Sequence, residues 1–233
     1  VPELMQQMAI YFVQFRPANI AENQYHLLLK FLVENKQIAD TTIFTLNYEL
    51  LLDQCAYNLN LKIDPIGNSS SEDSLKVIKL HGGCNLVPDS TKLRVSRAAT
   101  FTKDALFQGD AKYLVNPNEV LEFCLGDNGL PPIMSLIMRK KPVQVSSFIL
   151  DNYQKIWKDT LSENNKVIII GVNPNNEDSH IWEAVKTSPS KIYFVGTKDK
   201  IDKTLGNSNL QYEIIGNRFK ESLEAILKIL KEG

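Results

Sequence analysis

The sequence predicts an α/β protein with a Rossmann-like, doubly wound parallel sheet and an irregular or helical segment inserted into it. Short β-branched runs alternate with segments of helical periodicity, which is typical of parallel sheets covered by helices. Polar or glycine residues follow these runs, as expected at the carboxyl edge where such sheets bind ligands. With 233 residues, the chain is long enough for one such domain. We therefore expect a single domain over 1–233, with 84–145 as an insertion or small subdomain.

The first half of the expected sheet lies before residue 84. Apolar residues recur at three- and four-residue spacing over 20–39, which predicts a helix, and a β-branched strand over 41–46 follows it. A second helix is expected over 48–59, and a second strand over 75–80. Between them, 64–74 reads as a polar, exposed loop that contains a triple serine.

The second half begins after an irregular stretch. Residues 84–135 carry scattered Pro and Gly and a small Lys/Arg cluster, and we assign them to the irregular or helical insertion. Beyond it, helical and β-branched patterns alternate again. We expect helices over 145–161, 176–187 and 217–231, and strands over 166–171, 191–195 and 211–215.

Composition excludes several classes of protein. Lys plus Arg number 26 against 27 Asp plus Glu, so the net charge of -1 predicts no direct nucleic-acid binding. No run approaches the roughly 20 apolar residues of a membrane span, and no signal-peptide pattern opens the chain. The three cysteines fit neither a disulfide framework nor a zinc site, and no other cluster has metal-ligand spacing. These observations predict a soluble, cytoplasmic protein without a metal.

Two expected strands end on side chains suited to catalysis. The run TIFTLNYE over 42–49 places Asn47 past its apolar part, and VIKLHGG over 77–83 ends on His81 and two glycines. An asparagine amide donates and accepts hydrogen bonds, and a histidine titrates near neutral pH. Glycine has no Cβ, so backbone there can approach a ligand closely. We expect a small polar ligand between these two strand ends.

Each of these residues also has a structural interpretation. Asn47 is equally suited to cap the next helix, because asparagine is among the best N-cap residues. His81 is alternatively a turn histidine bonded to a carbonyl. His26 and His180 are expected to be structural or solvated, and Cys84 to be a small buried residue rather than a nucleophile.

Two later strands also end on small or amide residues. IGVNPNNED over 170–178 runs from a strand into a turn and then a helix, whose amides suit a ribose or phosphate oxygen. Asn175 or Asn176 is alternatively only the cap of that helix. VGTKD over 195–199 closes the next strand in the same way. Four such strand ends together favour a binding site over four unrelated turns.

The order of these motifs resembles the sirtuin-like family. It combines Thr-x-Asn-Tyr-acidic at 45–49, Leu-His-Gly at 80–82, and Ile-Ile-Gly-x-Asn at 169–173, with Asp178 seven residues after the glycine. More specifically, the chain is similar to the bacterial branch whose members cleave NAD in anti-phage defence. The resemblance covers about residues 20–230, and 84–145 only loosely.

The resemblance implies a role for each matched residue. Asn47 would orient the nicotinamide ribose or the attacking water, and His81 would act as general base. The residues beside Asn47, Thr45 and Leu46, would contact the cofactor. The remaining cofactor contacts would come from the second half of the chain: Gly171, Asn173, Asp178, Gly196 and Thr197.

Three departures from the family bear on function. The paired Cys-x-x-Cys motifs of protein deacylases are absent, so a deacylase is disfavoured and no zinc is expected. Leu46 stands where deacylases carry Gln. No glycine precedes Gly67, so the family's phosphate-binding glycine loop is missing before Asn47. Either a further strand, loop and helix precede residue 1, or the chain lacks this cradle.

The sequence thus supports two principal hypotheses. The first is an NAD+ glycohydrolase, a nicotinamide-releasing hydrolase of a prokaryotic defence system, for which NAD is the substrate. The second is an inactive NAD- or ADP-ribose-binding or assembly module with the same fold. Expected partners are a nucleotide and either further copies of the chain or another defence-system domain or protein, without membrane attachment. An unrelated Rossmann-type nucleotide binder would require the motif order to be coincidence.

Overall fold

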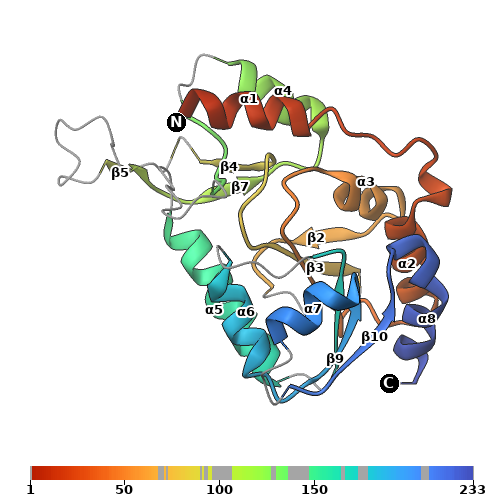
Figure 1. The fold of residues 1–233 in the computed structure, drawn as a ribbon. Helices are drawn as coiled ribbons and strands as arrows, with labels where there is room; N and C mark the ends of the chain where they lie inside the picture. The colour runs from red at the N-terminus through yellow and green to blue at the C-terminus, as the bar shows by residue number, and fades with distance from the viewer. Residues whose placement is uncertain are drawn as a thin grey trace. The chain divides into compact units, whose positions relative to one another are not determined.

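A computed structural model describes residues 2–67, 71, 73–89, 91, 94–95, 107–126, 130–135, 147–163, 166–172, 178–205 and 210–232. The chain divides into two compact units, Val1–Tyr153 and Gln154–Gly233. Helix α5 (Ser147–Glu163) runs across the boundary between them in sequence. Each unit contains its own parallel sheet (Figure 1).

The sheet of the first unit has three parallel strands in the order β1-β3-β2, with bounds Thr42–Thr45, Ser74–Lys79 and Lys62–Asp64. The central strand β3 is the most buried, since five of its six residues are inaccessible to solvent. Continuous burial is typical of a central parallel strand, both faces of which are covered. Helices α2 (Gln24–Glu34) and α3 (Leu51–Asn58) pack against each other beside this sheet.

The rest of the first unit is built from short elements. Helix α1 (Pro2–Phe12) packs on α4 (Pro117–Leu125), and the two lie side by side in Figure 1. A 3-10 turn, η1 (Ile20–Glu22), precedes α2. Two antiparallel pairs, β4-β7 and β5-β6, lie between β3 and α4. The bounds of these strands are Leu86–Pro88, Arg94–Val95, Phe107–Gln108 and Ala111–Tyr113.

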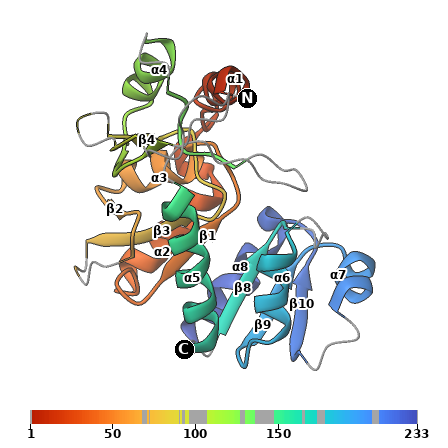
Figure 2. The same ribbon diagram turned by 90° about the vertical axis from the view of Figure 1, so that its left-hand side faces the viewer.

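The second unit contains a parallel sheet in the order β10-β9-β8. Its strands span Lys166–Ile170, Lys191–Val195 and Tyr212–Gly216. Figure 2 shows α6 and α8 on opposite faces of this sheet. The helices of the unit that follow these strands are α6 (Ser179–Lys186), α7 (Lys198–Leu205) and α8 (Phe219–Lys231).

The predicted fold class is confirmed: the chain has an α/β fold with parallel sheets, consistent with a Rossmann-like arrangement. The strands expected over 41–46, 75–80, 166–171, 191–195 and 211–215 are all present. Helices α1 and α7 and strand β2 were not expected. The single domain with an insertion over 84–145 stays a prediction. Among the described residues, no helix has the length and apolar character needed to cross a bilayer.

Candidate functional site

The register of β1 and β3 brings Asn47 and His81 to one edge of one sheet. Thr45 pairs with Lys79, and the Leu80 amide donates to the Thr45 carbonyl at 3.0 Å. Asn47 and His81 therefore each lie two residues beyond paired positions, where both parallel strands end. This is the carboxyl edge at which α/β sheets carry their ligand sites.

Asn47 is exposed and does not cap helix α3. Its backbone amide donates to the Thr45 hydroxyl at 3.0 Å, which fixes the turn after β1. Its side-chain Nδ2 donates to the Tyr25 hydroxyl and to Glu49 Oε1, each at 3.2 Å. The N-terminus of α3 is instead served by Glu49, whose other carboxylate oxygen accepts from the Leu51 amide. The N-cap interpretation of Asn47 is therefore wrong, because α3 begins too late in the chain. Leu46, between Thr45 and Asn47, is half-buried.

The backbone from His81 onward is hydrogen-bonded to the segment 130–135. Its carbonyl accepts from the Ser135 amide at 2.9 Å, and the Gly83 amide donates to the Ile133 carbonyl at 3.1 Å. The Ile133 amide in turn donates to the Leu86 carbonyl at 2.7 Å. The His81 side chain is only 2% exposed. The segment 130–135 thus holds the backbone at this histidine and in the residues that follow it.

The glycine after His81 allows the backbone of Ile133 to approach closely. Gly82 has φ +75°, and a Cβ built on it would lie 2.0 Å from the Ile133 carbonyl oxygen. The close approach expected here exists, but the group that approaches is the chain's own backbone. Contact of a ligand with this turn stays a prediction.

A buried ion pair lies directly beneath this edge, and the sequence analysis did not identify it. Lys79 Nζ donates to Asp53 Oδ2 at 2.9 Å, to the Glu49 carbonyl at 2.8 Å and to Asn85 Oδ1 at 3.1 Å. Lys79 is 2% exposed and Asp53 and Asn85 are fully buried. The Tyr113 hydroxyl donates to Asp53, and burial next to that carboxylate holds the pKa of Tyr113 well above its usual range.

This network connects the site to the segment that was expected to be an irregular insertion. The Asn85 side chain donates to Asp53 Oδ1 at 3.0 Å and to the Leu114 carbonyl at 3.1 Å. Lys79 lies two residues before His81, and it binds the carbonyl two residues after Asn47. One ammonium group therefore ties the two turns that carry the candidate catalytic residues.

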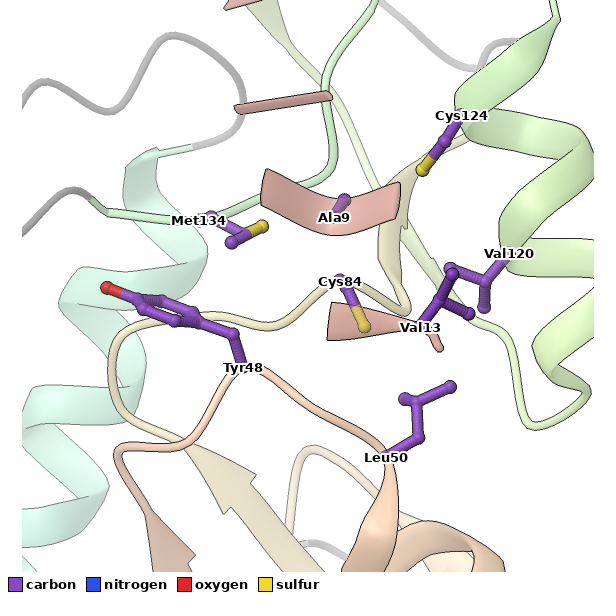
Figure 3. Packing of buried hydrophobic residues seen from close by; sticks show 8 residues of the cluster. All are labelled: Ala9, Val13, Tyr48, Leu50, Cys84, Val120, Cys124 and Met134. Atoms are coloured by element: carbon purple, nitrogen blue, oxygen red, sulfur yellow. The ribbon is translucent and has the colours of Figure 1, made fainter. Parts of the chain in front are cut away.

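An apolar cluster supports the same two turns. Tyr48 follows Asn47, and its hydroxyl donates to the Ser135 carbonyl; its ring centroid lies 6.5 Å from that of His81. Cys84 is fully buried, as expected, and burial raises the pKa of its thiol to about 12. Figure 3 shows the cluster, to which α1, α4 and both turns contribute: Ala9, Val13, Tyr48, Leu50, Cys84, Val120, Cys124 and Met134.

The remaining predicted site residues belong to the second unit. Gly171 and Gly196 directly follow β8 and β9, and their amides donate to the Val195 and Gly216 carbonyls, each at 2.9 Å. They therefore lie together at the carboxyl edge of that sheet. Thr197 is exposed and begins the turn into α7, where its carbonyl accepts from the Lys200 amide at 3.2 Å.

Asp178 takes the place at the start of α6 that was considered for Asn175 or Asn176. It is buried, and its carbonyl accepts from the Ile181 amide at 2.9 Å, so the helix begins three residues later than expected. Asn173, predicted to contact the cofactor, lies outside the described residues, as do Asn175 and Asn176. The roles of these residues toward a cofactor stay predictions.

Comparison with known proteins adds no family. No protein-family model matches the chain, and no curated protein sequence matches it.

Proposed function

We propose that the chain is an NAD+ glycohydrolase that releases nicotinamide in a prokaryotic defence system. One observation carries the proposal: the register of β1 and β3 sets Asn47 and His81 at equal distances past paired strand positions, at one sheet edge. The resemblance of the surrounding motifs to sirtuin-like NADases supplies the substrate. The buried bonds of Lys79 support it, because they hold both turns in place.

The proposed reaction breaks the bond between the ribose C1′ and the nicotinamide nitrogen. Nicotinamide leaves with the bonding electron pair as a neutral molecule, and an oxocarbenium-like ribose remains. A water oxygen bonds to C1′, and the water proton is released, giving ADP-ribose. Asn47 would orient the ribose or the water by hydrogen bonding, and His81 would accept the proton as general base.

A second candidate is a binding or assembly module without catalysis. The burial of His81 favours it, since a general base must reach the proton that it abstracts. In this case the chain would bind NAD or ADP-ribose at the same edge, or would act by assembling with copies of itself or with another defence protein. His81 would then be a structural turn residue.

Nicotinamide release from NAD tests the two candidates against each other. The parent chain and His81→Gln are compared, because glutamine preserves polarity and much of the volume at this buried position. The glycohydrolase requires release by the parent, and a loss of at least about 100-fold in the variant, the usual contribution of a general base. Release that is unchanged in a folded His81→Gln variant would contradict the role of His81.

If the parent releases nothing, the assembly candidate is examined with the same protein. Thermal melting with ADP-ribose and size-exclusion mass with and without NAD are measured. A raised melting temperature, or a mass that changes with NAD, would support a binding or assembly module. No response in either measurement would exclude both candidates for this chain.

A further inference from the structure

The side chain of Asn47 is held by two acceptors from different parts of the first unit. Its Nδ2 donates to the Tyr25 hydroxyl on α2 and to Glu49 Oε1 in the turn before α3, each at 3.2 Å. A primary amide nitrogen carries two hydrogens, so these two bonds use both of them. A carboxylate only accepts, so the Asn47 atom facing Glu49 is the nitrogen and not the oxygen.

Both acceptors are themselves anchored. The second carboxylate oxygen of Glu49 accepts from the Leu51 amide at the start of α3. Tyr25 lies in the first turn of α2, where its own amide donates to Asn23 Oδ1 at 2.9 Å. Burial and the charge of Glu49 raise the pKa of Tyr25 to about 12, so its hydroxyl stays protonated and neutral at physiological pH.

The oxygen of the Asn47 amide takes no part in these two bonds. Within the part of the chain that the structure describes, Oδ1 has no hydrogen-bond partner, and the residue is exposed. An amide oxygen is an acceptor only, so its natural partner is a hydroxyl or water donor. A free-standing asparagine would present its NH2 group equally well by rotation about its terminal torsion.

We infer that Tyr25 and Glu49 are positioning residues, which fix Asn47 so that its Oδ1 receives a hydroxyl hydrogen from the ligand. The inference rests on the proposed function for the identity of that ligand. Under it, the donor is a hydroxyl of the ribose next to nicotinamide, or the attacking water. Tyr25 and Glu49 act through Asn47 and touch neither.

The first experiment measures coupling between Tyr25 and Asn47. ADP-ribose affinity and NAD turnover are measured for the parent, Tyr25→Phe, Asn47→Ala and the double variant, with Tyr57→Phe as control, since Tyr57 is 71% exposed on α3. A ribose donor predicts that Tyr25→Phe weakens ADP-ribose binding about fivefold in the parent, and less than about twofold when Asn47 is alanine. ADP lacks that ribose, and its affinity should not change.

The two possible donors give different patterns. If the donor is water, Tyr25→Phe lowers kcat about fivefold and leaves ADP-ribose affinity unchanged. Either pattern supports the inference. An effect of Tyr25→Phe that is the same with and without Asn47, or no larger than that of Tyr57→Phe, overturns it.

A second experiment does not depend on NAD. The side-chain NH2 signals of Asn47 are followed by NMR in asparagine-labelled protein, and assigned with Asn47→Asp. Two hydrogen-bonded protons predict slow exchange with water in the parent and at least about tenfold faster exchange in Tyr25→Phe. Fast exchange in the parent overturns the inference. If the parent shows slow exchange but neither hydrolyses NAD nor binds ADP-ribose, the proposed function fails while the positioning of Asn47 stands.

Discussion

At the scale of single residues, the turn after β3 depends on the missing Cβ of Gly82. Its φ of +75° costs an alanine about 1–2 kcal/mol, and the built Cβ would also collide with the Ile133 carbonyl oxygen at 2.0 Å. Backbone cannot withdraw as a flexible side chain can. Since Ile133 holds Gly83, the collision would reach the backbone around His81.

Gly82→Ala is therefore expected to lower the free energy of unfolding by about 2–5 kcal/mol, the sum of the φ and overpacking costs. Gly67→Ala is the matched control, because Gly67 has the same φ of +75° but only an ordinary 3.4 Å contact with Ile78. It should lose only the φ cost of about 1–2 kcal/mol. Urea unfolding measures both. Equal losses in the two variants would show that the Ile133 carbonyl yields, contrary to this account.

At the scale of elements, sequence patterns predicted those with strong periodicity and missed those defined by packing. The run over 166–170, KVIII, has a β-branched pattern that needs no tertiary information. Strand β2 has three residues, and no local pattern distinguishes it from the loop that was expected to begin at Asp64. Its ladder with β3 supplies the missing information.

The site was predicted unevenly for the same reason. Asn47 and His81 were visible because each follows an apolar run. Lys79 and Asp53 were not, because a charged residue is normally exposed and nothing local reveals that two of them meet in the interior. Tyr25 was hidden in a helical pattern, 22 residues from the asparagine that it contacts.

The Lys79 network gives a test at this scale. Lys79→Met would leave Asp53 buried without its counter-charge, with an expected loss of about 3–5 kcal/mol in the free energy of unfolding. Adding Asp53→Asn should restore part of it, because the uncompensated charge is then gone while an oxygen remains to accept from Asn85 or Tyr113. Urea unfolding is the measurement, and Lys30→Met, which removes an exposed i,i+4 pair with Glu34, should leave the midpoint unchanged. A Lys79→Met variant as stable as the parent would refute the network's role.

At the scale of the whole molecule, buried cysteine thiols, which are neutral in the fold, make the free energy of unfolding decrease at alkaline pH. Burial raises the pKa of the Cys55 and Cys124 thiols to about 11 and that of Cys84 to about 12, against an ordinary 9.0. Unfolded thiols ionise first, so these groups stabilise the fold fully below pH 9.0, and this stability is lost as pH rises toward 11–12.

The urea midpoint should therefore fall between about pH 8 and pH 10.5. Cys84→Ala removes the thiol with the largest shift of the three, so its midpoint should fall less steeply, whatever its stability at neutral pH. Midpoints of parent and variant are measured at both pH values in reducing buffer. Equal declines of the urea midpoint in the parent and in Cys84→Ala would mean that the Cys84 thiol is not buried and neutral in the folded protein.

The central claim is that the paired ends of β1 and β3 form a site for NAD cleavage, and nicotinamide release by Asn47→Ala tests it most directly. Asn58→Ala is the control, because Asn58 is exposed at the end of α3 and far along the chain from the strand end. The account predicts release by the parent and Asn58→Ala, and a loss of at least about 100-fold in a folded Asn47→Ala variant. Equal release by all three proteins would contradict it.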